Sequence, residues 1–299
     1  MKACFAVDDI KTPKGFLLRG LWFGPKKPEQ LIIWVHGLSS SAFSMLHVVG
    51  ELADSTTAVM TFNNRGAEKV IDVRKEGKKA KSLRAGSAHE VFTQCVDDIE
   101  GAINYARRKG IKNIYLAGHS TGCQKSVYWA SKKSGGRGVK GIILLAPVSD
   151  YAAAVKFDRG GELARLTKLA RKLVREGKKH QLMPSVLSDG SLNDAQRFLS
   201  LNTPDSIETT FPYEQKGKRP RVLQAVKKPM LVIWAAEDEY SDRPPAEIAR
   251  WFDQNIKSKH KVVVVPGVRH SFSAKGGSAS GGKGAEKKVA QEIKAFINA

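Results

Sequence analysis

Residues 113–133, which read NIYLAGHSTGCQKSVYWASKK, decide the fold of this chain. Asn113–Ala117 is a short apolar run of strand length, and Cys123–Lys133 has the composition of a helix. Between them the turn GHSTG, Gly118–Gly122, matches the pattern G-x-S-x-G, which places a serine on a tight strand-to-helix connection. The flanking glycines let neighbouring backbone approach, so the turn lifts the hydroxyl above the sheet. The sequence therefore predicts Ser120 as a nucleophile.

Other apolar runs of the same length alternate with helical patterns along the chain. This alternation predicts an α/β fold with a mostly parallel central sheet flanked by helices. We expect strands at Ala3–Val7, Phe16–Phe23, Leu31–Val35, Thr57–Phe62, Asn113–Ala117, Gly141–Ala146, Met230–Ala235 and Lys261–Val265. We expect core helices at Ala42–Ala53, Ala88–Arg108, Cys123–Lys133, Pro245–Asn255 and Gly284–Ile297, and a basic loop from Glu68 to Gly86.

The alternation stops between Tyr151 and Lys228, where the sequence is helical, loop-rich and basic. We therefore predict a core of residues 1–150 and 229–299, with residues 151–228 inserted after the sixth strand as a helical lid. Within this insertion, Glu162–Glu176 places leucines on one stripe and basic residues on the opposite face. Such a helix either covers the active site or lies on an anionic lipid surface.

A serine hydroxyl needs a base, and the chain has seven histidines. His270 follows the last strand, so it falls at the carboxyl edge of the sheet together with Ser120. His260 precedes that strand and falls at the opposite edge. His119 is expected to be structural, and His180 lies in the insertion, from which it could reach the site. We predict His270 as the base.

The base in turn needs an acid that fixes its tautomer. Asp238 follows the strand Met230–Ala235 at the same edge. Asp150 follows the preceding strand and is the competing candidate. With Asp238 the chain order is Ser120, Asp238, His270, which is the order nucleophile, acid, histidine.

The developing oxyanion of an acyl transfer needs backbone donors. The Leu38 N–H follows the strand that ends at His36-Gly37, and the Thr121 N–H follows the nucleophile. Gly37 would allow close approach of this backbone. We predict the N–H groups of Leu38 and Thr121 as the oxyanion hole.

The composition limits the kinds of binding partner that we expect for this chain. The chain has 299 residues, with 50 basic and 29 acidic side chains, and hence a net charge of +21. This excess would suit a polyanion or an anionic membrane. The basic residues are spread along the chain, and no zinc-finger spacing or RNA-binding aromatic pattern accompanies them. We therefore expect no specific nucleic-acid partner and at most a weak association with anionic surfaces.

Three further patterns bear on location and cofactors. The scattered cysteines Cys4, Cys95 and Cys123 exclude a disulfide framework and a CxxC metal site. The N-terminus reaches Asp8 before any apolar region, which does not fit a secretory signal. The glycine-rich stretch Gly276–Gly284 resembles a P-loop but lacks the Ser/Thr that holds magnesium. We expect a soluble, cytoplasmic protein without metal or cofactor.

Together the motifs His36-Gly37, Gly118–Gly122, Asp238 and His270 resemble the α/β-hydrolase fold over nearly the whole chain. A narrower set of stretches is similar to a poorly characterised α/β-hydrolase family catalogued as a domain of unknown function. These stretches are GHSTGCQKSVYW (118–129), APVSDYAAA (146–154), REGKKHQLMP (175–184), AQRFLSL (195–201) and EDEYSDRP (237–244). One branch of that family is associated with hydrolysing ester bonds in hydroxamate siderophores.

The resemblance implies a serine ester hydrolase with a helical cap, and the residues predict the same chemistry. We expect hydrolysis of a small-molecule acyl or aryl ester in two steps through an acyl-enzyme. Two alternatives stay open. The same three side chains could act on thioesters, amides or C–C bonds, or the chain could be a non-catalytic binding protein that works through its basic surface.

Overall fold

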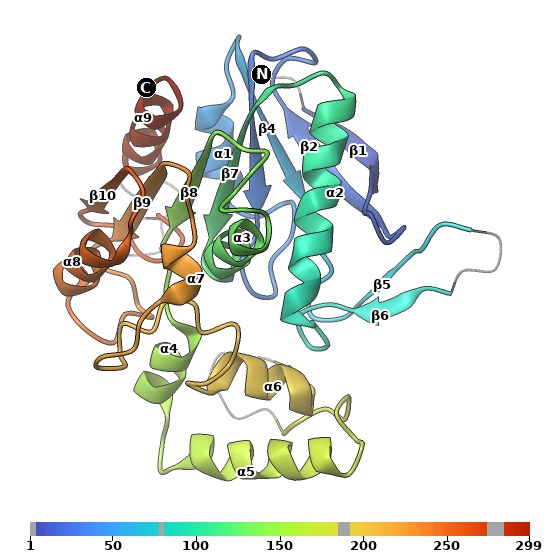
Figure 1. Cartoon of the computed structure of the whole chain (residues 1–299), viewed down its shortest axis with the longest axis vertical. Coiled ribbons are helices and arrows are strands. Elements are labelled where there is room, and N and C mark those ends of the chain that lie inside the picture. The colour runs from blue at the N-terminus through green and yellow to red at the C-terminus, as the bar shows by residue number, and fades with distance from the viewer. Residues whose placement is uncertain (1–3, 78–80, 185–191, 274–283) are drawn as a thin grey trace.

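The computed structural model of the chain describes residues 4–77, 81–184, 192–273 and 284–299. Its centre is a sheet of eight strands in the order β1-β2-β4-β3-β7-β8-β9-β10 (Figure 1). The strands are β1 (Cys4–Lys11), β2 (Leu17–Phe23), β3 (Gln30–Val35), β4 (Thr57–Phe62), β7 (Asn113–His119), β8 (Gly141–Leu145), β9 (Met230–Ala235) and β10 (His260–Val265).

The strands from β4 to β10 in this order pair in parallel, whereas β1 and β2 form an antiparallel edge. All residues of β4, β8 and β9 are buried. Continuous burial is expected when helices cover both faces of a parallel sheet. The predicted α/β class is confirmed, and the carboxyl ends of the six parallel strands share one edge.

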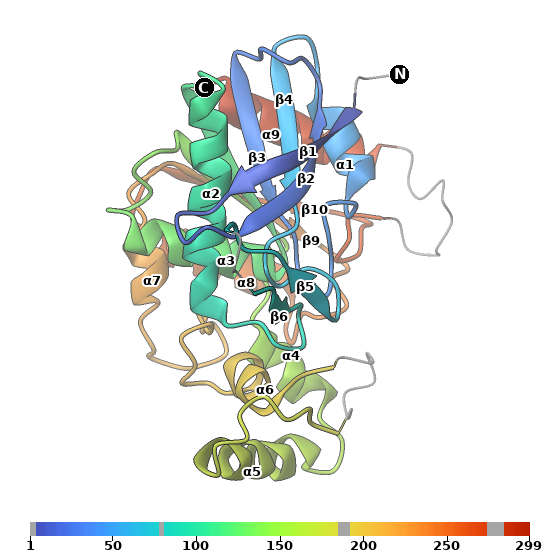
Figure 2. The ribbon, with the colours of Figure 1, turned by 90° about the vertical axis from the view of Figure 1, so that its right-hand side faces the viewer.

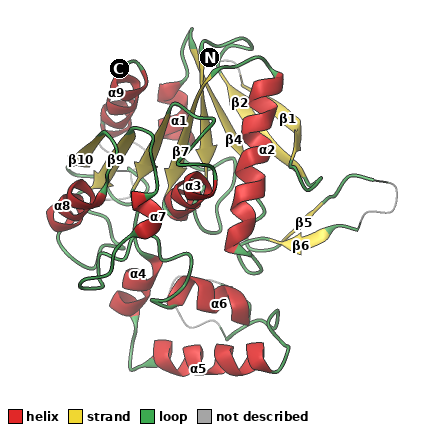
Figure 3. Ribbon diagram, viewed as in Figure 1, coloured by secondary structure: helices red, strands yellow, loops and turns green. Residues whose placement is uncertain are grey.

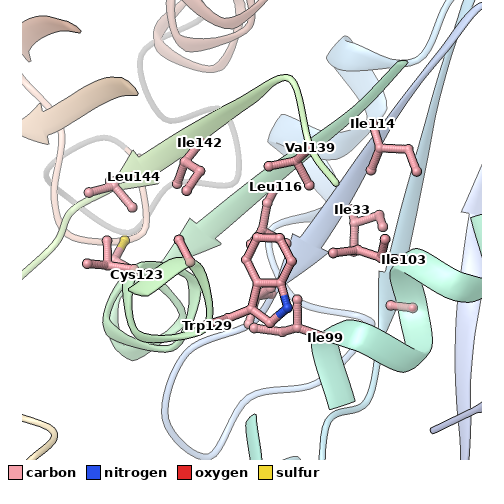
Figure 4. Close-up of a cluster of buried hydrophobic side chains, with 14 of the residues drawn as sticks. Ile33, Ile99, Ile103, Ile114, Leu116, Cys123, Trp129, Val139, Ile142 and Leu144 are labelled. Atoms are coloured by element: carbon pink, nitrogen blue, oxygen red, sulfur yellow. The ribbon is translucent and has the colours of Figure 1, made fainter. Parts of the chain in front are cut away.

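Helices cover both faces of the sheet (Figure 2). The core on one face includes side chains of α2 (Cys95–Arg108), α3 (Thr121–Lys132) and α8 (Pro245–Asn255). The core on the other face includes side chains of α1 (Leu46–Leu52) and α9 (Ala285–Ile297). Figure 4 shows part of the first core, where Trp129 of α3 lies among apolar side chains of α2 and the strands. This packing fixes the start of α3 against the end of β7.

Between β8 and β9 the described residues include the helices α4 (Asp150–Phe157), α5 (Glu162–Arg175), α6 (Ala195–Asn202) and α7 (Arg221–Gln224). In Figures 1 and 3, α4, α5 and α6 lie beyond the carboxyl ends of the parallel strands. The apolar face of α5 packs on α6 and its flanks through Leu166, Ala170 and Leu173. The opposite, basic face of α5 is exposed.

Two helix predictions are wrong at their starts. The helix expected at Ala42–Ala53 begins only at Leu46, because Met45 has a left-handed backbone with φ 59°. The helix expected at Ala88–Arg108 is α-helical only from Cys95, after a single 3-10 turn at Phe92–Gln94, because the chain before that turn is held as a loop. There the N–H groups of Ser87 and Ala88 bond to the carbonyls of Glu68 and Lys69.

Part of the basic loop expected at Glu68–Gly86 is a short hairpin, formed by β5 (Ile71–Val73) and β6 (Leu83–Ala85). It projects from the body of the molecule in Figure 1. The glycine-rich stretch Gly276–Gly284 lies outside the described residues except for its last residue. Within the described part of the chain, every helix is too short or too polar to cross a lipid bilayer.

Candidate active site

Ser120 occupies a sharp turn between β7 and α3. Its backbone has φ 55° and ψ −127°, a conformation that costs on the order of 1–3 kcal/mol for a residue with a side chain. Two hydrogen bonds hold it, from the Ser120 N–H to Leu145 O (3.0 Å) and from the Cys123 N–H to Ser120 O (2.8 Å). The predicted turn is thus present, with the strain that raises a nucleophile above a sheet.

Three glycines make this turn possible. A Cβ on Gly122 would lie 2.1 Å from Val35 O, and one on Gly118 would lie 2.3 Å from Gly122 O. A Cβ on Gly37 would lie 2.9 Å from Ser120 Cβ. Each position therefore excludes a side chain, and the loop after β3 lies directly against Ser120.

The structure joins His270 to Asp238, as the sequence predicted. His270 Nδ1 lies 2.7 Å from Asp238 Oδ2, and the Asp238 carboxylate is buried. The second carboxylate oxygen, Oδ1, accepts the Tyr240 N–H at 2.9 Å. An Nδ1–H that donates to Asp238 leaves the lone pair on Nε2, which is the tautomer a general base requires.

Neighbouring side chains hold the His270 loop. Glu239 Oε2 accepts the His270 N–H at 2.9 Å, and the Tyr240 ring lies 4.7 Å from the imidazole. His119 Nε2 lies 3.0 Å from His270 O, and the two rings are 5.0 Å apart. Burial, followed by the nearby His270, lowers the pKa of His119 to about 3. His119 is therefore neutral, and its Nε2–H donates to the His270 carbonyl.

This contact links His270 to the turn that carries Ser120, because His119 directly precedes Ser120. Within the described residues, no hydrogen bond joins Ser120 Oγ to His270 Nε2. Catalytic hydrogen bonds of this kind are often long in the free protein and shorten when substrate binds.

The predicted oxyanion donors are also at the turn. Among the hydrogen bonds of the described residues, none is donated by the N–H groups of Leu38 or Thr121. His36 supports the loop before Leu38, since its Nδ1 lies 2.9 Å from Gly37 O. Burial and the charge of Lys125 lower the pKa of His36 to about 4, so this histidine is neutral. Two unpaired donors thus remain beside Ser120.

Asp150, the competing acid, has a different partner. Gln124 Nε2 donates to Asp150 Oδ2 at 2.8 Å. Burial, followed by the charge of Glu208, raises the pKa of Asp150 to about 8. A carboxyl group that keeps its proton at pH 7 cannot supply the negative charge that stabilises an imidazolium. The geometry therefore favours Asp238 over Asp150 as the partner of His270.

A chain of buried charges behind the site was not predicted. Lys125 Nζ lies 2.6 Å from Glu90 Oε1, and Arg197 of α6 lies 2.9 Å from Glu90 Oε2. Arg197 also pairs with Glu208. Although burial alone would raise the pKa of Glu90, Lys125 and Arg197 lower it. The carboxylate is therefore ionised, and it links α3 to α6.

His180, which the sequence analysis allowed to reach the site from the insertion, has another partner. Its Nδ1 lies 2.9 Å from Asp194 Oδ2, and His89 Nδ1 lies 3.0 Å from the same oxygen. Neither histidine hydrogen-bonds to Ser120, Asp238 or His270 in the described part of the chain. Among the described residues, His89, His180 and Asp194 are the three side chains that converge as metal ligands would.

Comparison with known proteins agrees with this architecture. A family model described as "Protein of unknown function (DUF1749)" matches residues 85–298. No curated protein sequence matches the chain significantly.

Several solved structures share the fold. The siderophore hydrolase EstB from Aspergillus fumigatus is 15% identical with a TM-score of 0.66, and the match covers 94% of each chain. A soluble variant of monoglyceride lipase from Saccharomyces cerevisiae is 13% identical with a TM-score of 0.62, covering 97% of this chain and 95% of its own. Est1E from Butyrivibrio proteoclasticus, solved with ferulic acid, is 18% identical with a TM-score of 0.57, covering 99% and 94%. The α/β-hydrolase fold is thereby confirmed.

Proposed function

The chain belongs to the family described as Protein of unknown function (DUF1749), and from its site we propose that it is a serine carboxylic-ester hydrolase. Ser120 is the nucleophile, His270 the general base and Asp238 the acid that orients it. One observation carries the proposal. Ser120, on a strained positive-φ turn, directly follows His119, whose Nε2 lies 3.0 Å from the carbonyl oxygen of His270, and His270 Nδ1 lies 2.7 Å from the buried carboxylate of Asp238.

In the first step His270 Nε2 takes the Ser120 proton while the oxygen attacks the ester carbonyl carbon. Asp238 keeps the ring in the required tautomer and stabilises the imidazolium. The N–H groups of Leu38 and Thr121 hold the oxyanion, and a single donor of this kind contributes about 2.7–4 kcal/mol. The alcohol then leaves with the proton from His270.

In the second step water replaces the alcohol. His270 takes a proton from the water as its oxygen attacks the acyl-enzyme carbonyl, and the same donors hold the second oxyanion. Collapse returns the proton to Ser120 and releases the acid. The balance is one ester and one water consumed, with one acid and one alcohol formed.

We further propose that residues 151–228 act as a lid over the core of residues 1–150 and 229–299. Helix α4 lies against the acid-bearing loop, since Lys156 Nζ donates to the carbonyls of Glu239 (2.8 Å) and Ser241 (2.7 Å). The Phe157 ring lies 6.0 Å from the Tyr240 ring, which in turn contacts His270. This aromatic wall suits a small-molecule acyl or aryl ester. Solved structures that share the fold include a siderophore hydrolase and an esterase, in keeping with this substrate class.

The test is covalent labelling with a fluorophosphonate probe together with turnover of p-nitrophenyl esters of graded acyl length. We expect labelling and turnover in the native chain. Ser120→Ala should abolish labelling and lower kcat by about 10⁶-fold. Ser131→Ala is the matched control, because Ser131 lies near the end of α3, the helix that Ser120 precedes, and its hydroxyl donates to Tyr128 O at 2.7 Å. That variant should behave like the native chain.

Two other results would redirect the proposal. Labelling at Ser120 without hydrolysis of any ester would move the reaction to thioesters, amides or C–C bonds. No labelling, combined with tight and salt-sensitive binding of a polyanion, would identify a non-catalytic protein that works through its basic surface.

A further inference from the structure

Three side chains that play no part in the proposed reaction meet where the core contacts α6. His89 comes from the loop after β6, His180 from the loop after α5, and Asp194 from the residue before α6. Both Nδ1 atoms point at one oxygen, Asp194 Oδ2, at 3.0 and 2.9 Å, and the three ligand atoms all lie within 4.8 Å of one another. We infer that this cluster binds a Zn²⁺ ion.

The carboxylate is held ready for this role. Asp194 Oδ1 accepts the Arg197 N–H at 2.8 Å as the cap of α6, which turns Oδ2 toward the two histidines. The Asp194 N–H donates to Ala88 O at 2.8 Å, so the aspartate is bound to the same loop that carries His89. Backbone contacts alone therefore fix two of the three ligands relative to each other.

The spacing fits a tetrahedral ion. Zinc lies about 2.0–2.2 Å from histidine nitrogen and carboxylate oxygen, so tetrahedral ligand atoms stand roughly 3.3 Å apart. The two Nδ1 atoms lie 2.9 and 3.0 Å from Asp194 Oδ2, so these two separations need a shift of a few tenths of an ångström. The two Nδ1 atoms lie within 4.8 Å of each other, so the larger adjustment falls on this third separation. Each neutral imidazole binds the ion through the Nδ1 lone pair once its proton resides on Nε2.

The site is open on one side. The side chain of Asp194 is fully buried and that of His89 is 15% exposed, whereas that of His180 is 57% exposed. An ion can therefore enter from solvent on the His180 side. A water molecule would take the fourth position, as in other zinc sites with three protein ligands. The bound ion would connect the 86–90 loop of the core to the inserted segment.

The experiment is titration of the purified, metal-free full chain with Zn²⁺ by calorimetry, and with Co²⁺ by absorption of its d–d bands. We expect one ion per chain and tetrahedral Co²⁺ bands. Binding should weaken at acid pH, because a histidine binds the ion only as the neutral imidazole. His180→Ala should weaken binding by about 100-fold or more. Because His180 is largely exposed, this variant should fold like the native chain.

His260→Ala is the matched control. His260 Nε2 lies 3.3 Å from the carboxylate of Asp253, away from the cluster, and the variant should bind Zn²⁺ as the native chain does. His89→Gln is a second ligand variant and should lose binding as His180→Ala does. Saturable Zn²⁺ binding that is equal in the native chain and His180→Ala would overturn the inference, as would no saturable binding at all. A loss in His270→Ala instead of His180→Ala would place the ion at the catalytic pair. None of these measurements depends on turnover.

Discussion

Asp150 and Asp238 follow neighbouring parallel strands, β8 and β9, yet they have different partners. Asp238 is buried but accepts a hydrogen bond from His270 and another from the Tyr240 N–H. Asp150 is half-buried, it bonds to the neutral amide of Gln124 and lies near the negative charge of Glu208, and its pKa rises to about 8. Position at a strand end is therefore insufficient to make an acid catalytic. The hydrogen-bond partners and charges around each aspartate distinguish Asp238 from Asp150.

The largest expected effect tests this contrast directly. Asp238→Asn keeps the shape of the side chain but removes the charge and favours the wrong tautomer of His270. We expect kcat for p-nitrophenyl esters to fall by about 10⁴-fold. Circular dichroism of the variant should match that of the native chain. A mild effect here, together with a crippling effect of Asp150→Asn, would reverse the assignment of the acid.

A smaller effect is expected at Glu239, which accepts the His270 N–H and is itself exposed. Glu239→Ala removes this support and lets the imidazole drift from Ser120. We expect kcat to fall between tenfold and about 10²-fold with little change in KM. Glu239→Gln retains an acceptor oxygen and should recover most of the activity. If both variants behave like the native chain, Glu239 does not position His270.

The smallest effect on turnover is expected for Asp150→Asn, which should leave kcat almost unchanged. The substitution should instead change the free energy of unfolding. The folded chain keeps the Asp150 proton up to a pH of about 8, whereas an aspartate with the ordinary pKa of 3.8 loses it much earlier. Unfolding between these pH values releases a proton, so rising pH favours the unfolded chain. The Asp150→Asn variant has no carboxyl proton to release at this position, so its free energy of unfolding lacks this dependence on pH.

The measurement is the free energy of unfolding of native chain and variant, by denaturant titration from pH 4 to pH 8. Asp150→Asn should gain stability relative to the native chain across this range, by on the order of a few kcal/mol at the upper end. A difference that stays constant with pH would show that Asp150 is ionised in the folded protein.

The sequence predicted the edge of the sheet that carries the proposed site better than the segments around it. Apolar runs such as Leu31–Val35 and Met230–Ala235 have one stable arrangement, a buried parallel strand, and the residues that follow them must lie at one edge. The motif around Ser120 depends on backbone geometry that only glycine allows, which is a local property. For these reasons His270 and an aspartate at a strand end could be expected to meet. Chain order alone does not distinguish Asp238 from Asp150, and the hydrogen bond to His270 does.

Other features depend on contacts that no local pattern encodes. Cys95 begins α2 because loop residues such as Ala88 bond to distant backbone instead of continuing the helix. The hairpin of β5 and β6 is too short and too basic for a periodic signal. His89, His180 and Asp194 are brought together only by the return of the inserted segment to the core, and their spacing along the chain gives no hint of it.

The buried pairs Lys125–Glu90 and Glu90–Arg197 limit how the proposed enzyme can admit its substrate. Lifting α6 away from the sheet would strip Arg197 from its carboxylate partners, and breaking a buried pair of this kind costs about 3–5 kcal/mol. A conformer with α6 raised would thus make up less than about 1% of molecules. We therefore expect α6 to stay in place during turnover, so that substrate enters and product leaves without displacing this helix.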